Sequence, residues 1–235
     1  MTETSEAGTA TKSRREQRRI QQQDLSRRQL LDAAELVFSS KGYHDATLKE
    51  IAEVAEFSVG SVYSFFENKD DLFFSVFLRR GDELLPAIRE IALGDRGDDV
   101  DPMAKVHALV DLEIGFFRDH SAFGRLFLRT SSATSLSAER PVDEAMRSRF
   151  GEAMALHAGV IGEGQAAGVV RAGPPEVLAR LLSSLVAGYQ ASDPAVVGDD
   201  EAPAGAPMDL DAFHALVDDA LRAPKGAVGT PGGRR

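Results

Sequence analysis

The chain of 235 residues contains no cysteine, and Asn68 is its only asparagine. Without cysteine, disulfides, thiol nucleophiles and zinc or iron–sulfur sites built on thiolates are excluded. No apolar run approaches the roughly 20 residues that a membrane-spanning helix needs, and the polar first residues lack the hydrophobic stretch of a secretory signal. With 43% hydrophobic residues and a net charge of −10, the sequence predicts a globular cytoplasmic protein with no membrane association.

Positive charge is scarce overall but concentrated near the N-terminus. The segment 12–28 holds seven cations against Glu16 and Asp24, whereas residues 81–235 carry 15 basic and 24 acidic groups. Such a basic edge can meet phosphate while the acidic remainder avoids it, although a solvated basic tail has the same composition. We therefore treat residues 1–24 as a basic arm, either flexible or helical, and either an extension of the first helix or a helix of its own.

Between the ends of the chain, apolar residues recur at spacings of three and four, the period of an α-helix. Three of the clearest stripes are formed by Leu30, Ala33, Ala34, Val37 and Phe38, by Met103, Val106, Val110, Ile114 and Phe117, and by Leu178, Leu181, Leu182, Leu185, Val186 and Tyr189. Sustained strand-type alternation is absent, so the predicted fold class is all-α. Residues 1–12 and 223–235 are expected to be disordered, 193–207 to form a flexible loop and 94–102 an acidic one.

Capping signals mark where several helices begin. Thr47 and Glu50 match the capping box, in which each side chain satisfies a free backbone N–H at the helix start. Ser13 and Ser26, each followed three residues later by Glu or Gln, fit the same pattern. Asn68 is a good N-cap, with two aspartates in the following turn.

The segment from Thr47 to Leu72 predicts a helix-turn-helix. A helix over 47–55, a turn over 56–58 and a second short helix over 59–66 have the required lengths. In such a motif the second helix enters the major groove of DNA and its first residues reach the base edges. Those residues are Val59, Gly60, Ser61 and Ser64, while Ser58 can cap the helix.

The region from Arg28 to Val76 resembles the DNA-binding part of the TetR family of bacterial transcriptional regulators. The most specific matching positions are Gly42-Tyr43, Thr47 with Ile51-Ala52, Ser58 to Tyr63, Phe66, and Lys69 with Asp71-Leu72. The resemblance implies a three-helix helix-turn-helix head over 25–70, a larger helical body for effector binding and dimerisation over 71–222, and a disordered tail over 223–235. It also implies a homodimer that binds an operator and releases it when a small molecule binds.

By the same resemblance, Thr47 and Ser58 contact phosphate or cap there, Val59, Gly60, Ser61 and Ser64 lie at the groove, and Tyr63 and Lys69 hold the DNA backbone. This chain departs from the family pattern in three places: Glu56 replaces the usual turn glycine, Phe65 replaces a frequent phosphate-binding tyrosine, and Val59 replaces a residue that is often basic. We therefore expect the basic segment Lys12–Arg28 to supply phosphate or minor-groove contacts that the head lacks, and Arg27 and Arg28 are its candidate DNA-binding residues.

The body is predicted in less detail. Candidate lining residues for a hydrophobic effector pocket are Met103, His107, Phe116, Phe117, Phe123, Phe127, Met146, Phe150, Met154 and Tyr189, with Glu113, Arg118 and His157 as further polar candidates. Candidate dimer-interface residues, on predicted helices over 175–191 and 209–222, are Leu178, Leu181, Leu182, Leu185, Tyr189, Phe213 and Val217. Ordinary core packing is the alternative for both sets.

Enzyme motifs are missing. The glycines from 162 to 168 do not follow a predicted strand and their spacing departs from the dinucleotide-binding pattern, and the five histidines are scattered. No catalytic residue, cofactor or metal site is predicted. The favoured function is a ligand-responsive, operator-binding repressor released by a small hydrophobic effector. The alternative is a helical small-molecule-binding protein or enzyme whose head no longer reads DNA.

Overall fold

The computed structural model describes residues 13–94, 101–131, 144–198, 202–203 and 208–224. Within these residues the fold is all-α, as predicted, with ten helices and no strand beyond an isolated bridge between Val170 and Arg222. The N-terminal segment 1–12, including Lys12, most of the acidic loop and the tail from residue 225 lie outside the described residues.

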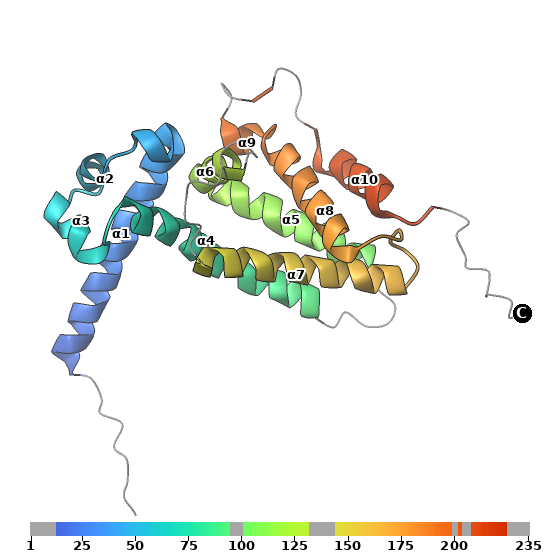
Figure 1. The fold of residues 1–235 in the computed structure, drawn as a ribbon, viewed down its shortest axis with the longest axis horizontal. Helices are drawn as coiled ribbons and strands as arrows, with labels where there is room; N and C mark the ends of the chain where they lie inside the picture. Colours follow the sequence, from blue (N-terminus) through green and yellow to red (C-terminus); the bar gives the residue numbers. More distant parts are fainter. Residues whose placement is uncertain (1–12, 95–100, 132–143, 199–201, 204–207, 225–235) are drawn as a thin grey trace, which may run out of the picture.

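Figure 1 shows a small head at the left and a larger body at the right. The head consists of α1, α2, α3 and the first half of α4, and the body contains the rest of α4 together with α5 to α10. The helices are α1 (Arg14–Asp45), α2 (Leu48–Val54), α3 (Val59–Phe65), α4 (Lys69–Leu93), α5 (Met103–Asp119), α6 (Ser121–Ser131), α7 (Glu144–Ala166), α8 (Pro175–Gln190), α9 (Pro194–Val197) and α10 (Leu210–Leu221).

The first helix is longer than the head requires. Its N-cap is Ser13, whose side chain accepts a hydrogen bond from the N–H of Glu16, and it continues without a break past Ser26, which is buried inside the helix and starts nothing. The described part of the basic arm is therefore an extension of α1. Near the other end, Gly42 adopts φ 76° and ψ 173°, a non-helical conformation that favours glycine and bends the chain there.

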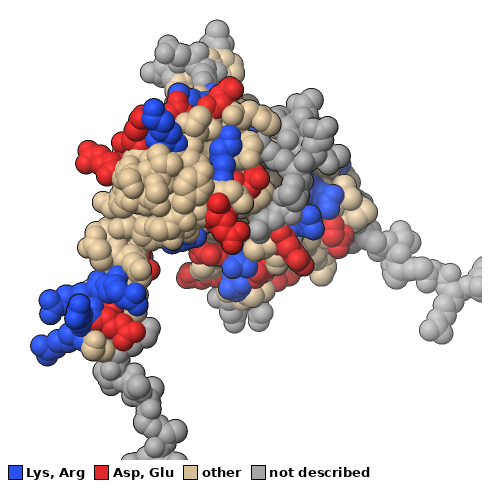
Figure 2. Space-filling model, turned by 60° about the vertical axis from the view of Figure 1, so that its left-hand side comes forward, with Lys and Arg blue, Asp and Glu red and all other residues tan. Residues whose placement is uncertain are grey.

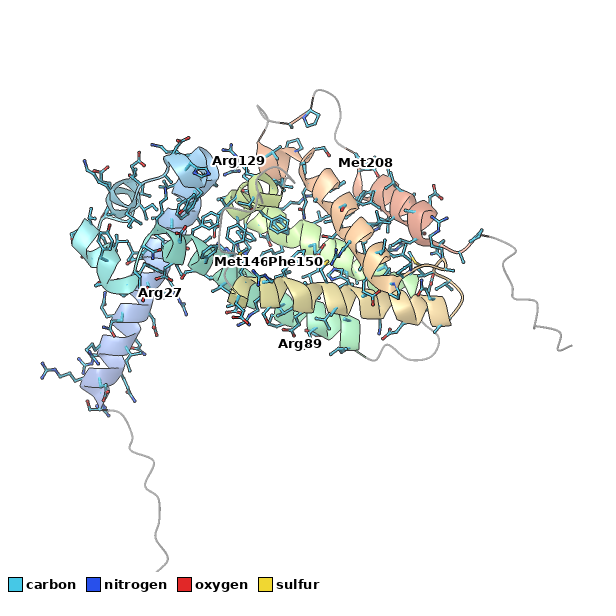
Figure 3. All side chains as sticks on the ribbon, in the orientation of Figure 1. Arg27, Arg89, Arg129, Met146, Phe150 and Met208 are labelled. Atoms are coloured by element: carbon cyan, nitrogen blue, oxygen red, sulfur yellow. The ribbon has the colours of Figure 1, made fainter. Side chains whose placement is uncertain are left out.

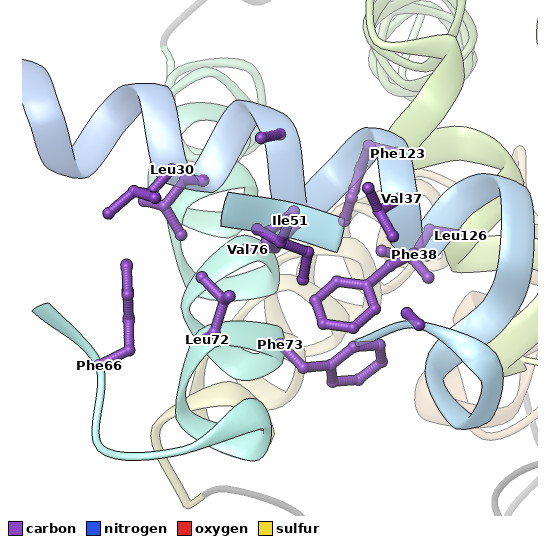
Figure 4. Close-up of a cluster of buried hydrophobic side chains, with 14 of the residues drawn as sticks. Leu30, Val37, Phe38, Ile51, Phe66, Leu72, Phe73, Val76, Phe123 and Leu126 are labelled. Carbon is purple, nitrogen blue, oxygen red and sulfur yellow. The ribbon is translucent and has the colours of Figure 1, made fainter. Parts of the chain in front are cut away.

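The head has an apolar core made by four helices. Leu30, Phe38, Ile51 and Leu72 are completely buried, and Figure 4 shows their side chains converging between α1, α2 and α4. The same cluster continues into the body through a group that comprises Phe117, Phe123, Leu126 and Val196. The head core is thus closed on one side by α5, α6 and α9.

The body has a second core of mostly aliphatic side chains from α4, α5, α7, α8 and α10. One local expectation fails here. The expected flexible loop at 193–207 begins with the short helix α9, because Asp193 caps it and Val196 is fully buried. Pro102 is the N-cap of α5. Helix α4 continues through Pro86, which faces solvent.

Candidate nucleic-acid interface

The turn between α2 and α3 is built from capping residues and one strained position. The hydroxyl of Thr47 accepts from the N–H of Glu50 at 3.2 Å, and a Glu50 carboxylate oxygen accepts from the Thr47 N–H at 3.0 Å, which confirms the capping box. Lys41 and then Thr47 hold the pKa of the Glu50 carboxyl below its usual value by hydrogen bonding. Glu56 has φ 60°, the left-handed conformation that the missing glycine predicted.

Helix α3 presents an uncharged polar surface. Val59, Gly60, Tyr63 and Ser64 are exposed, and Tyr63 has 57% of its surface open to solvent. Ser58 caps the helix by accepting from the N–H of Ser61 at 3.0 Å. A Cβ on Gly60 would meet only the Ser58 hydroxyl, at 3.8 Å, so the backbone there is open to approach. All the predicted groove residues of α3 therefore lie on or beside one open surface.

Lys69 and Arg27 have roles inside the chain that sequence reasoning missed. The ammonium of Lys69 donates to the carbonyls of His44 and Ala46, at 3.1 and 2.8 Å, and lies over the Tyr43 ring. Lys69 therefore fixes the connection between α1 and α2. Only one of its three ammonium N–H groups then remains for the expected contact with the DNA backbone. Arg27, half-buried, donates to the Phe65 carbonyl at 3.3 Å (Figure 3).

The guanidinium of Arg27 also donates to the Ser75 hydroxyl at 3.1 Å and lies 4.4 Å from the centre of the Phe66 ring. It thus joins α1 to the end of α3 and to α4. A half-buried arginine with three such partners positions the recognition helix and is not free for phosphate, whereas Arg28 is exposed. The signal in the sequence was weak, because Arg27 lies within a run of cations that all look alike.

A cluster of charged residues joins the head to the body. Glu35, 5% exposed, accepts from Arg79 at 2.8 Å and from two nitrogens of Arg80 at 2.8 and 2.9 Å. Although burial lowers the pKa of Arg80, the hydrogen bonds that it donates to Glu35 and Glu83 raise this pKa above its ordinary value. The sequence held one clue to this cluster, an acid on the buried stripe of α1. Removing one partner of such a buried pair is costly because the other charge is left unpaired.

The predicted pocket residues do not gather in one place. Phe116, Phe117, Phe123 and Phe127 pack together in the cluster shared with the head, with ring centres of Phe117 and Phe123 5.7 Å apart. The remaining candidates lie elsewhere. Met103 and Tyr189 belong to the second core, and His107 pairs with Asp218 at 2.8 Å and stacks on His214. The other three lie on α7, where Met154 is half-buried and Met146 and Phe150 are near the start of the helix (Figure 3). Phe150 is 53% exposed. A single pocket formed by all ten residues therefore has no geometric support.

A buried acid–histidine pair lies in the body instead. His157, 1% exposed on α7, places Nε2 3.1 Å from a carboxylate oxygen of Glu113 on α5, and its Nδ1 lies 2.7 Å from the Ala153 carbonyl. Burial lowers the pKa of His157, but the hydrogen bond and charge of Glu113 outweigh it, so the pKa lies above its ordinary value. Glu113 and His157 were both polar candidates in the sequence analysis, but because they are 44 positions apart, nothing in the sequence indicated that they form a pair.

Most of the predicted dimer residues belong to the protomer core. Leu178, Leu182, Tyr189, Phe213 and Val217 are buried, because they pack in the second core against α5 and each other. Leu185 is half-buried, and Leu181 alone of the seven is exposed, at 53%. The face of these two helices that remains open lies on the side away from the second core. Its members are Val177, Leu181, Ser184 and Gly188 of α8 and Leu216 of α10.

None of the described helices is long and apolar enough to cross a bilayer. No group of three or more histidine, aspartate or glutamate side chains in that part of the chain is arranged to hold a metal ion.

A short helix presented on a capped turn, with a helical body behind it, defines the class of helix-turn-helix DNA-binding proteins. Residues 30–76 match the family model described as "Bacterial regulatory proteins, tetR family". The transcriptional repressor NicS of Pseudomonas putida is 27% identical over 153 residues, which cover 65% of this chain and 69% of NicS. The transcriptional activator FasR of Mycolicibacterium smegmatis is 40% identical over 67 residues, which cover 28% of this chain and 31% of FasR.

Among solved structures, FadR of Bacillus subtilis in complex with stearoyl-CoA superposes with a TM-score of 0.61 at 18% identity, covering 82% of this chain and 95% of that one. The fold therefore extends to the whole body, although sequence similarity is strongest in the head. The chain belongs to the TetR family of transcriptional regulators, which are DNA-binding proteins and not enzymes.

Proposed function

We propose that this regulator is a homodimeric repressor, which binds a near-palindromic operator and leaves it when a hydrophobic effector binds the body. The observation that carries the DNA-binding part is the open, uncharged surface of α3, where Gly60 lets the backbone approach the groove. Ser61, Ser64 and Tyr63 can donate hydrogen bonds to base edges or phosphates without carrying charge.

The test uses duplexes selected by the full-length protein from random and genomic DNA. The substitution Gly60→Leu adds a side chain where DNA must approach but where the protein leaves room. We expect the variant to bind the selected duplex at least tenfold more weakly while it keeps its folding stability. Gly151→Leu is the matched control, because Gly151 is an exposed helical glycine on α7 with nothing near its Cβ. Equal binding by both variants contradicts the proposed role of α3.

The open face of α8 and α10 supports the proposed dimer. Val177 and Leu181 are 51% and 53% exposed, and Gly188 on the same side of α8 has open space at its Cβ. Small and apolar residues together allow helices of two protomers to approach closely, and a twofold dimer matches a palindromic site. Light scattering on Leu181→Glu should show a monomer, whereas Leu93→Glu, at a 69% exposed leucine on α4, should leave the dimer intact.

The sign of regulation is taken from NicS, the repressor with the longer match, whereas FasR is named an activator. A repressor lowers transcription from a promoter that overlaps its operator. We therefore expect deletion of the gene to raise expression from a reporter that carries the selected site. Reduced expression after deletion would instead identify an activator.

For the effector, the body offers an apolar interior with one buried polar pair, Glu113 and His157. An apolar molecule with a single polar end fits such an interior. Because the structurally similar FadR was solved with stearoyl-CoA, the first probes are stearoyl-CoA, free stearate and coenzyme A alone. We expect one of the two acyl compounds to reduce operator affinity 5- to 150-fold, the range of ordinary allosteric coupling. Release by coenzyme A alone would contradict a hydrophobic effector.

A further inference from the structure

The cations of the head are unequally available for DNA. Arg27 and Lys69 bind groups inside the chain, Lys41 pairs with Glu50, and Lys49 lies 3.7 Å from Glu53. Helix α3 itself has no charged residue. The sequence already showed that the head has few cations, and in the structure most of them have a partner within the chain, with the exposed Arg28 as the exception. A strong attraction of this head to phosphate therefore needs further cations outside it.

Four further cations lie on the N-terminal extension of α1. Arg14, Arg15, Arg18 and Arg19 are exposed and make no ion pair or side-chain hydrogen bond within the part of the chain that the structure describes. At 100° per residue they occupy about 140° of the helix surface, so all four lie on one side. Figure 2 shows them as a blue group at the free end of the extension.

The extension is built as a helix although nothing in the described chain buries it. Residues 14–24 are exposed apart from the half-buried Ile20, yet Ser13 caps their first turn and the helix runs unbroken into the head core at Leu30. Like charges four residues apart destabilise an isolated helix. Four arginines on one side therefore carry a cost that a phosphate backbone would remove by neutralising them.

The length and direction of the extension suit DNA beyond the half-site. Figure 1 shows α1 continuing past α3 and away from the body, so the extension avoids the acidic part of the chain. Its 11 residues from Arg14 to Asp24 span about 16 Å at 1.5 Å per residue. At 3.4 Å per base pair this equals about 5 base pairs, or half a turn of DNA.

We propose that residues 14–24 form a rigid helical arm whose four arginines bind the phosphates of duplex DNA flanking the half-site read by α3. This inference rests on the proposed operator binding and adds a second, sequence-independent contact to it. The arm would supply most of the salt dependence of binding, whereas α3 would supply the preference for one sequence.

The test combines salt titration with hydroxyl-radical footprinting on the selected duplex and on a mixed-sequence 40-base-pair duplex. In one variant Arg14, Arg15, Arg18 and Arg19 are all replaced by Gln; in its control all four are replaced by Lys. We expect the Gln variant to lower the slope of log affinity against log salt by about 2 to 7, because each lost phosphate contact removes about 0.9 and a dimer has eight. Protection should also shrink by about 5 base pairs on each side, while the Lys control keeps most of the slope.

A second variant, Gln22→Pro, keeps every charge but breaks the helix between the arm and the head. It should lose the flanking protection while retaining part of the salt slope. Unchanged slope and footprint in the Gln variant would overturn the proposal, and a lower slope without a shorter footprint would overturn the flanking position. Wild-type behaviour of Gln22→Pro would overturn the rigid arm.

The proposed function fails separately from this inference. Gly60→Leu should lose the preference for the selected duplex but keep salt-dependent binding to the mixed-sequence duplex through the arm. If no sequence is selected by a folded wild-type dimer, operator reading is wrong. If a sequence is selected but the arginines have no effect, the arm alone is wrong.

Discussion

The head and the body of this protein bury different kinds of groups. The head core consists of apolar and aromatic side chains, and its buried acid Glu35 is held by two arginines at the junction with the body. The body keeps His157 and Gln190 inside its core, each only 1% exposed, with His157 against Glu113. Among the described residues the body therefore buries a histidine, a side chain that changes charge near neutral pH, whereas His44 of the head is exposed.

The largest expected effect removes an aromatic side chain from the head core. Phe38 is fully buried, with its ring centre 5.2 Å from that of Phe73, so Phe38→Ala should lower the free energy of unfolding by about 4 kcal/mol. Urea denaturation followed by circular dichroism measures the change. Leu36→Ala is the control, because Leu36 on the same helix is 53% exposed and should cost under about 0.5 kcal/mol. Similar losses in both variants would show that the head core is not close-packed.

A smaller effect is expected from the buried pair of the body. His157→Gln should cost about 3 kcal/mol near pH 6, because Glu113 loses its partner in the core. The folded pKa of His157 lies above its unfolded value near 6.5. Its stabilising contribution is therefore complete below about pH 6.5 and is lost as the pH rises through the folded pKa.

Melting curves from pH 6 to 9 measure this dependence. The difference in melting temperature between wild type and His157→Gln should shrink as the pH rises, while His44→Gln, at an exposed histidine of the head, should show no such trend. A difference that stays constant with pH would mean that His157 is neutral in the folded protein. The body would then hold no charged histidine in its core, and this difference from the head would disappear.

The smallest effect compares equivalent helix caps in the two regions. Thr47 caps α2 in the head, and Asp209 caps α10 in the body by accepting from the N–H of Ala212 at 2.7 Å. Replacement of either by Ala should cost about 1 kcal/mol. Differential scanning calorimetry measures the loss of stability in each variant. A loss at either site three times larger than this expectation would show that the cap has a role beyond its own helix.

Sequence reasoning worked best where the signal was local. The caps at Ser13, Thr47, Ser58 and Asn68 are all confirmed, because each depends on residues within four positions of one another. The left-handed Glu56 is confirmed for the same reason. The helix-turn-helix itself could be predicted well, since its turn, caps and apolar spacing are encoded within one continuous segment.

Prediction failed where partners are distant in sequence. Tyr189 was assigned to both a pocket and a dimer surface, but it packs on Phe213 in the core and accepts from Arg118 at 3.1 Å. Periodicity identifies the apolar side of a helix but not whether the protomer or a second copy covers it. Arg27 shows the same limit, because its partners at Phe65 and Ser75 are 38 and 48 residues away.

The core that joins the head to α5, α6 and α9 limits how this protein can be rearranged. A chimera cut at residue 70 would leave Phe38 without Phe73, Phe123 and Leu126, which complete its cluster. Transplanting DNA specificity from this regulator to another therefore requires the donor's matching side chains from these body helices as well. The unit that can be exchanged is a discontinuous set of residues, because its members lie on both sides of the domain boundary at residue 70.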